Sequence, residues 1–216
     1  MSDTHPPGLV AAGSRLGQLL AAAGQPTLTD RQTGQFEAYL SLLRKWNARV
    51  NLTAIRDAEG ILSRHFVESI VCARALPQGI ANLLDLGSGA GFPGIPVAIC
   101  RPEIAVTLAE SQCKKSAFLQ EAVRTLGLEA QVHAGRAEDL GQKFDCVTLR
   151  AVDRMEQAVR VAAGLVRPGG WLALMTTQAE LAAVKAAAGD GFDWQEPVPL
   201  PGSGQRIVVL AHLLDK

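Results

Sequence analysis

The residues best suited to chemistry form a glycine-rich run at 84–94, LDLGSGAGFPG. The run follows a short apolar stretch and precedes a helical one, so it presents backbone N–H groups and a helix start to a ligand. A GxGxxG motif that begins at Gly89 is typical of a dinucleotide pyrophosphate site. An acid, Asp85, two residues before a GxGxG motif that begins at Gly87, instead suits a ligand with a positively charged amino-acid end.

A second carboxylate, Glu110, ends the next predicted strand. Such a carboxylate accepts hydrogen bonds from ribose hydroxyls in NAD and adenosyl sites alike, so it does not separate the two ligands. Asp85 does, because an acid is badly placed beside a pyrophosphate. The hairpin expected at the C-terminal end also separates the two ligands. Both features favour S-adenosylmethionine as the cofactor. The remaining alternative is a glycine-rich turn that binds nothing.

The elements that must position these residues change in character near residue 80. Residues 1–78 predict helices only, and from residue 81 strand-like runs alternate with helical ones. The expected helices are 9–23, 30–50 (capped by Thr29 or Asp30), 57–76, 95–100, 113–126, 154–166 and 179–188, and the expected strands are 81–87, 104–110, 129–134, 144–149 and 170–176. Strands separated by helices imply right-handed crossovers and a parallel sheet covered on both faces.

The C-terminal end breaks this alternation. Residues 192–199 and 206–214 are two extended runs joined by LPGSG, so we expect the last strand to enter the sheet antiparallel. We therefore predict an α/β fold with a Rossmann-like, mostly parallel sheet and an antiparallel C-terminal hairpin. The expected division is a helical N-terminal module, 1–78, followed by a cofactor-binding domain, 79–216.

Composition narrows the function classes. The 216 residues include 21 Lys and Arg against 21 Asp and Glu, and 5% are aromatic. This balance excludes a generally basic coat, and the few aromatics argue against a stacking surface for single-stranded nucleic acid. Residues 31–75 hold seven Lys and Arg against four Asp and Glu, a local charge of +3 that leaves room for a basic patch.

The four cysteines, Cys72, Cys100, Cys113 and Cys146, have neither CxxC spacing nor a nearby histidine. We therefore expect no metal site and reduced, mostly buried thiols. The N-terminus lacks the basic start and apolar run of a signal peptide, and no window approaches 18 apolar residues. These features predict a cytoplasmic protein without a membrane partner.

The glycine run with its Phe-Pro-Gly-Ile-Pro extension, residues 85–96, resembles the cofactor motif of the RsmG family, also called glucose-inhibited division protein B. The resemblance extends from about Trp46 to the C-terminus and includes, in order, NLT at 51–53, RH at 64–65 with Ser69, KK at 114–115 with FL at 118–119, and RAE at 136–138. It implies a class I S-adenosylmethionine-dependent methyltransferase that modifies guanine N7 in 16S ribosomal RNA. We expect a monomer that acts on this RNA or on the small ribosomal subunit, not on DNA.

The resemblance also assigns residues. It implies cofactor contacts at Gly87, Phe92, Ala137, Glu138 and Arg150, to which the glycine run and the predicted strand ends add Asp85, Gly89 and Glu110. The RNA-binding candidates are Arg64, His65, Lys114 and Lys115.

Three positions depart from the family pattern. Glu68 and Glu110 stand where the family usually has Asp, and both keep the charge. Leu149 replaces a usual Ser, so a hydroxyl contact is not transferred. Met175 stands where the family commonly has Lys, so a lysine contact to RNA is not transferred either.

Guanine N7 carries an exposed lone pair and loses no proton on methylation, so we name no catalytic base. Catalysis is expected from alignment and from the exclusion of water. Arg150 and His65 are the candidates beside the reacting groups. The alternatives are a salt bridge from Arg150 to Asp153 or another rim acid, a packing role for His65, and a solvated face for the two lysines.

Three other functions stay open on the sequence. One is an NAD(P)-dependent dehydrogenase, which a cofactor titration separates. The second is a small-molecule methyltransferase with the N-terminal helices as a lid. The third is a ribosome-associated factor that binds the cofactor without turnover.

Overall fold

The computed structural model describes residues 7–150 and 154–215. Its strands are β1 (Asn82–Leu86), β2 (Ala105–Ala109), β3 (Gln131–His133), β4 (Phe144–Arg150), β5 (Val166–Thr177), β6 (Phe192–Trp194), β7 (Val198–Pro199) and β8 (Arg206–Leu213). They form one sheet in the order β3-β2-β1-β4-β5-β8-β6, and β7 pairs with β8 off this path. The first five strands pair in parallel, whereas β8 is antiparallel to β5, β6 and β7. The predicted mostly parallel sheet with an antiparallel C-terminal hairpin is confirmed.

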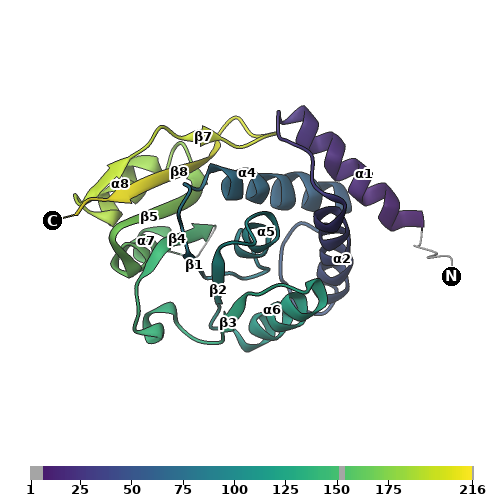
Figure 1. Cartoon of the computed structure of the whole chain (residues 1–216), viewed down its shortest axis with the longest axis horizontal. Helices are drawn as coiled ribbons and strands as arrows, with labels where there is room; N and C mark the ends of the chain where they lie inside the picture. The colour runs from purple at the N-terminus through teal and green to yellow at the C-terminus, as the bar shows by residue number, and fades with distance from the viewer. Residues whose placement is uncertain (1–6, 151–153, 216) are drawn as a thin grey trace.

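The helices cover both faces of this sheet. They are α1 (Pro7–Ala22), α2 (Asp30–Asn47), α3 (Ala58–Gly60), the π-helix η1 (Ile61–Val67), α4 (Glu68–Ala75), α5 (Gly94–Cys100), α6 (Cys113–Leu126), the 3-10 turn η2 (Ala137–Leu140), α7 (Met155–Leu165) and α8 (Leu181–Ala188). Figure 1 shows α2, α4, α5 and α6 on one side of the strands and α7 and α8 on the other.

Alternation along the strands produces this two-sided burial, because successive side chains of a strand face opposite ways. Leu83 of β1 belongs to the large core cluster under the N-terminal helices, α5 and α6. Its neighbour Leu84 belongs to the cluster under α7 and α8. The large cluster runs from Leu16 of α1 to Leu83, so the helical module packs on the sheet as part of one core. The domain division at residue 78 stays a prediction.

The predicted helix at 57–76 differs from expectation in its middle. Asp57 caps the start, since its side chain accepts a hydrogen bond from the Gly60 amide. The seven residues of η1 then follow π-helical geometry before α4 begins. A π-turn shifts the helix faces and often occurs at functional sites. Here it carries Arg64 and His65, and periodicity alone does not detect it.

Local side-chain bonds fix other element ends. Thr29 caps α2 with a reciprocal bond to Gln32, which confirms one of the two predicted caps. That helix ends at Asn47 rather than at residue 50, because Asn47 Oδ1 accepts from the Leu52 and Thr53 amides and holds the chain in a turn. The extended run at 192–199 is divided into β6 and β7.

Candidate functional site

The glycine turn joins β1 to α5 and is held together by its own amides. Gly87, Gly89 and Gly91 adopt φ values of 70°, 57° and 92°, which glycine takes without a Cβ penalty. The amides of residues 87, 88, 89, 91, 92 and 94 donate to oxygens of Ala109 (twice), Glu110, Ser88 (twice) and Asp85. These donors are therefore not available to cradle a pyrophosphate.

Asp85 lies beneath this turn and is fully buried. Its Oδ2 accepts the Gly94 amide at 3.1 Å, and its Oδ1 accepts the Thr148 hydroxyl at 3.0 Å. Burial raises the pKa of Asp85 to about 6. A Cβ on Gly94 would lie 2.6 Å from Oδ2, so the turn needs glycine at that position. Asp85 thus braces the turn, and its direct contact with a ligand stays a prediction.

Glu110, directly after β2, joins the turn from the other side. Its Oε2 accepts the Gly89 amide at 3.0 Å and its Oε1 accepts the Gln112 amide at 2.8 Å. Each carboxylate oxygen can accept a further hydrogen bond. The side chain is fixed, and it retains acceptor capacity for a pair of ribose hydroxyls.

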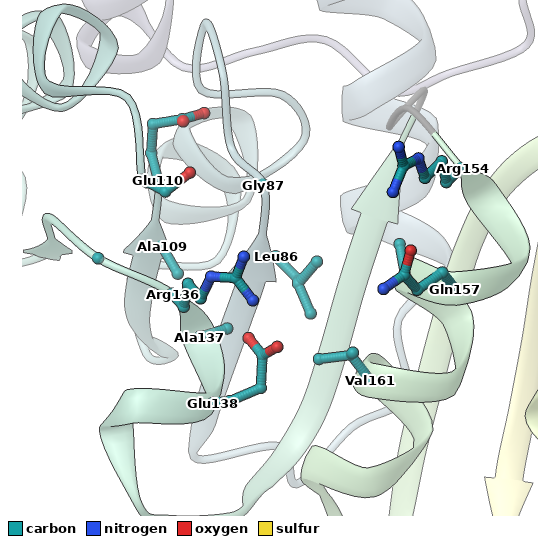
Figure 2. Close-up of a pocket in the computed structure, with 13 residues that line it drawn as sticks. Leu86, Gly87, Ala109, Glu110, Arg136, Ala137, Glu138, Arg154, Gln157 and Val161 are labelled. Atoms are coloured by element: carbon teal, nitrogen blue, oxygen red, sulfur yellow. The ribbon is translucent and has the colours of Figure 1, made fainter.

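A first cavity, about 300 Å³ in volume, opens at the carboxyl ends of β1 and β2. Figure 2 shows Arg136, Ala137 and Glu138 on one wall and Gln157 and Val161 of α7 on the other. Its remaining lining residues are Leu86, Gly87, Ala109, Glu110, Ser111, Gly135, Arg154 and Ala158. The lining thus mixes apolar groups with charged and polar ones, and convergent polar groups beside apolar surface are typical of a site for a small organic ligand.

A second cavity, about 510 Å³, lies on the other side of the glycine turn and shares Gly87 and Glu110 with the first. Its walls come from the segment after α2, from η1, from the turn itself, from the start of α6 and from the end of β4. The lining residues are Leu52, Thr53, Ala54, His65, Gly87, Ser88, Gly89, Ala90, Phe92, Glu110, Gln112, Lys115 and Arg150. The structure therefore collects most predicted cofactor residues around two cavities with a common wall.

His65 is half-buried in the second cavity. Its ring stacks on Phe92, with centroids 4.6 Å apart and planes 14° apart, and its Nε2 lies 2.7 Å from the Thr53 hydroxyl. Among the described residues its buried Nδ1 has no hydrogen-bond partner. Burial, aided by the charges of Arg150 and Arg64, lowers the pKa of His65 to about 3. His65 is therefore a neutral ring at the cavity wall.

Arg150, at the end of β4, is held in a buried ionic group that we call the Glu68 cluster (Glu68, Arg150 and Arg206). Glu68 is fully buried and accepts from Arg150 at 2.8 Å and from Arg206 at 2.7 Å. Arg150 also donates to the Arg64 carbonyl and the Ser69 hydroxyl. The rim acid that pairs with Arg150 is thus Glu68; Asp153, the other candidate, lies outside the described residues.

The remaining candidate residues lie in different places. Lys115 lines the second cavity, whereas Lys114 is exposed and lines neither the first cavity nor the second. Arg64 is exposed at a third cavity, beside Met175, whose side chain is buried. Leu149 is fully buried and has no polar group to offer.

Sequence reasoning missed the residues that hold the site from a distance. Tyr39 of α2 is buried among aromatic rings, and its hydroxyl donates to the Ala90 carbonyl inside the glycine turn. Arg206 reaches Glu68 across 138 residues of sequence. A Tyr in an apolar helix stripe predicts core packing, and no local pattern could have indicated its hydroxyl partner.

Within the ranges 7–150 and 154–215, no cluster of His, Cys, Asp and Glu suits a metal ion, and the four cysteines are not in disulfides. Cys72 and Cys146 are buried, Cys100 is partly buried and Cys113 is exposed. In the same part of the chain, no helix is long and apolar enough to cross a membrane.

Comparison with known proteins assigns a family model to most of the chain. Residues 32–190 match the GidB model, described as rRNA small subunit methyltransferase G. A ribosomal RNA small subunit methyltransferase G from Roseiflexus sp. (strain RS-1) is 40% identical over 198 residues, which are 85% of this chain and 84% of that protein. One from Stenotrophomonas maltophilia (strain K279a) is 43% identical over 180 residues, covering 79% and 82%.

Solved structures share the fold at lower identity. A methyltransferase from Pyrococcus furiosus superposes with a TM-score of 0.61 at 13% identity, covering 84% of this chain and 99% of that one. P. horikoshii TYW2, solved in complex with MeSAdo, gives a TM-score of 0.57 at 13% identity, covering 70% and 63%.

Proposed function

The chain belongs to the GidB family, rRNA small subunit methyltransferase G, and from this premise we propose that it transfers a methyl group from S-adenosylmethionine to N7 of a guanosine in 16S ribosomal RNA. The observation that carries the cofactor assignment is the glycine turn between two cavities with a common wall. The amides of the turn already donate to protein oxygens, and the Glu110 carboxylate can still accept hydrogen bonds from a ligand.

The cavities fit an adenosyl ligand with an amino-acid tail. In the first, Ala137 and Glu138 would hold the adenine, and Glu110 would accept the ribose hydroxyls. In the second, Gly87 and Phe92 would border the methionine end, near Arg150. These placements follow from the lining residues and from the resemblance of the motif.

A dinucleotide fits the same turn poorly. Its pyrophosphate needs donors at the start of α5, but the Gly94 amide there already donates to the Asp85 carboxylate. A second anion would face that buried acid. The occupied Gly94 amide, the buried acid and the family together disfavour the dehydrogenase alternative.

When bound, S-adenosylmethionine supplies an electrophilic methyl group, whose bond to sulfur breaks, with the electron pair kept by sulfur, as the bond to N7 forms. Because N7 attacks with a lone pair and loses no proton, the protein needs to align and desolvate the reactants rather than to remove a proton. The neutral His65 ring and the stacked Phe92 exclude water from the second cavity without adding charge.

RNA binding would use a small basic area. Lys115 at the second cavity and Arg64 at the edge of the third are the candidates nearest the site. With a local charge of +3 over residues 31–75, few phosphates are neutralised, so affinity should fall only shallowly with salt. We propose a monomer that acts on 16S rRNA or the small subunit in the cytoplasm, with no DNA or membrane partner.

Isothermal titration tests the cofactor assignment. We expect 1:1 binding of S-adenosylmethionine or S-adenosylhomocysteine, no binding of NAD, and loss of binding in Gly87→Trp. Gly34→Trp is the matched control, since Gly34 lies on an exposed face of α2 with open space around it. Failure of the unmodified protein to bind either adenosyl compound would reject the proposal.

Methyl transfer from labelled S-adenosylmethionine to unmethylated small subunits or to 16S rRNA tests the reaction. We expect 7-methylguanosine as the product. Binding without transfer would instead favour a non-catalytic ribosome-associated factor.

A further inference from the structure

A third cavity of about 230 Å³ opens at the carboxyl ends of β4 and β5, next to the start of β8. This edge is where open α/β sheets bind ligands. The cavity shares one residue with the second cavity, Arg150, which therefore borders both. Its lining residues are Arg64, Glu68, Arg150, Met155, Met175, Thr176, Thr177, Glu180, Leu200 and Arg206.

The walls of this cavity combine apolar and polar groups. Met155, Met175 and Leu200 provide the apolar part, and the last two are buried. Met175 lies opposite Arg150 in the strand register, so its side chain adjoins the guanidinium. An apolar surface beside a guanidinium plane suits the flat face of a nucleobase.

Arg150 offers donors in a fixed position. Its Nη2 donates to Glu68 and to the Arg64 carbonyl, and its Nη1 donates to Ser69. A guanidinium has five N–H groups. Within residues 7–150 and 154–215, its Nε–H and one Nη1–H have no acceptor, so the group is rigid and still has donors for a ligand.

Glu180 is exposed, and hydrogen bonds from two neighbouring threonines hold one of its carboxylate oxygens in place. Its Oε2 accepts from the Thr176 hydroxyl at 2.9 Å, the Thr177 hydroxyl at 3.0 Å and the Thr177 amide at 3.3 Å. In the described part of the chain, no hydrogen bond reaches Oε1. The Thr177 hydroxyl also accepts the Glu180 amide, so reciprocal bonds join these two residues in the turn before α8 and involve Oε2 but not Oε1. These bonds to the carboxylate lower the pKa of Glu180, so it is ionised at neutral pH.

We propose that the third cavity takes the base of the target guanosine, with O6 accepting from the Arg150 guanidinium and the N1–H and N2–H groups donating to Oε1 of Glu180. This inference rests on the proposed function and names the substrate subsite within it. N7 is adjacent to O6 on the base, so this placement puts the nucleophile on the Arg150 side, toward the second cavity.

The pairing selects guanine. Adenine presents an amino donor where guanine has O6 and has no N2 amino group, so it would place a donor against Arg150 and leave Oε1 of Glu180 without a partner. Pyrimidines have no N7. Methylation leaves a positive charge on the purine ring, and the Glu180 carboxylate favours that charge as it develops.

Glu180→Gln is the informative substitution, because the amide oxygen of glutamine can accept the same bonds from Thr176 and Thr177 and so keep the turn before α8. Glu156→Gln is the matched control: Glu156 is an exposed carboxylate of α7, paired with Arg160, that does not line the third cavity. The substrate is 16S rRNA assembled by ligation with guanosine or inosine at the methylated position, as purified RNA or as reconstituted subunits, whichever the unmodified protein methylates. Inosine differs from guanosine only in lacking the N2 amino group.

Two readouts are needed: kcat/KM for methyl transfer, and the Kd of each RNA in the presence of S-adenosylhomocysteine. We expect inosine to lower kcat/KM by about 10-fold or more for the unmodified protein and for Glu156→Gln, as for a lost hydrogen bond to a charged group. In Glu180→Gln, whose guanosine activity falls by about 10- to 100-fold, inosine should cost less than about threefold. The Kd values should follow the same pattern at an unchanged Tm.

An inosine effect of equal size in Glu180→Gln and the unmodified protein would overturn the subsite while leaving the proposed function intact. Absence of N7 methylation by the unmodified protein would overturn both.

Discussion

The glycine turn and the Glu68 cluster both position the candidate site, but their bonds span different sequence separations. The turn is closed by contacts over short or moderate sequence separations: Gly94 bonds Asp85 nine residues away, and Gly89 bonds Glu110 at a separation of 21. The cluster joins Glu68 to residues 82 and 138 positions later. The sequence can predict a motif whose hydrogen-bond partners lie within or near it. A buried charge whose partners are far away in the sequence can be identified only from the structure.

The two regions also differ in how they tolerate change. The turn consists largely of backbone bonds, so it is sensitive to added volume. The cluster consists of charges removed from water, so it is sensitive to the loss of any one partner. Substitutions in each region should therefore differ in both size and kind.

The largest effect is expected from Glu68→Gln. The change leaves two guanidinium groups with one neutral partner, and removal of one member of a buried ion group costs about 3 kcal/mol or more. The free energy of unfolding from urea titration measures it. Glu59→Gln is the control, since the Glu59–Arg15 pair is exposed at 53% and 46% and should contribute little. Equal losses in the two variants would contradict the distinction.

Gly94→Ala should have the next largest effect. A Cβ there would lie 2.3 Å from Leu108 Cδ2 and 2.6 Å from Asp85 Oδ2, an overpacking that costs about 2 to 3 kcal/mol and displaces the turn. We also expect cofactor affinity to fall. Gly89→Ala, where the nearest atom is at 3.8 Å, should cost about 1 kcal/mol, from the positive φ alone. Thermal unfolding and calorimetry of the pair test this difference, and equal losses would count against it.

Tyr39→Phe tests the link between helix α2 and the glycine turn. It removes the donor to the Ala90 carbonyl and leaves that buried acceptor without its partner, at a cost of about 1 to 2 kcal/mol. Because the carbonyl lies in the turn, Kd for S-adenosylhomocysteine should rise while kcat changes less. A loss of stability with an unchanged Kd would assign Tyr39 to core packing only.

The smallest effect near neutral pH is expected from the titration of His65. His65 has a folded-state pKa of about 3, below its ordinary value, so it stays neutral and its NMR ring shifts should not titrate between pH 5 and 8. The stability that it contributes is present above about pH 6.5 and is lost as the pH falls toward 3. A titration midpoint near 6.5 would show that the ring is accessible to water.

The contribution of Asp85 to the pH dependence of stability should have the opposite sign. Its folded-state pKa is raised to about 6, so the stability linked to its protonation is present below about pH 4 and is lost as the pH rises through 6. The difference in urea stability between the unmodified protein and Asp85→Asn, followed from pH 4 to 7, isolates this slope. A pH-independent difference would contradict the burial of the acid.

The same comparison separates what the sequence predicts from what it does not. The alternation of strands and helices, the antiparallel end and the glycine motif follow from local periodicity and turn chemistry, so the sequence predicts them. The π-helix at Ile61–Val67 is not predicted, because Leu62, Phe66 and Ile70 have the i, i+4 spacing of an ordinary α-helix. The sequence places Asp85 facing the ligand, but its burial beneath the turn depends on Thr148 of a strand that lies far away in sequence.

The residues of the candidate site can also be separated into those that the sequence predicts and those that it does not. Gly87, Phe92, Ala137, Glu138 and Arg150 line the cavities, and the cofactor contacts that the motif resemblance implies for them stay a prediction. The partners of Arg150 come from α4 and β8. The side chain of Glu180 bonds only Thr176 and Thr177, which are close to it in sequence, and this local pattern predicts nothing of its second oxygen.

The most direct test of the proposed methyl transfer is a mass map of 16S rRNA from a strain in which the gene is deleted, compared with the parent and with the strain carrying the gene on a plasmid. We expect that one 7-methylguanosine disappears on deletion, returns with the intact gene and does not return with Gly87→Trp. A map that is unchanged by the deletion would contradict the proposal.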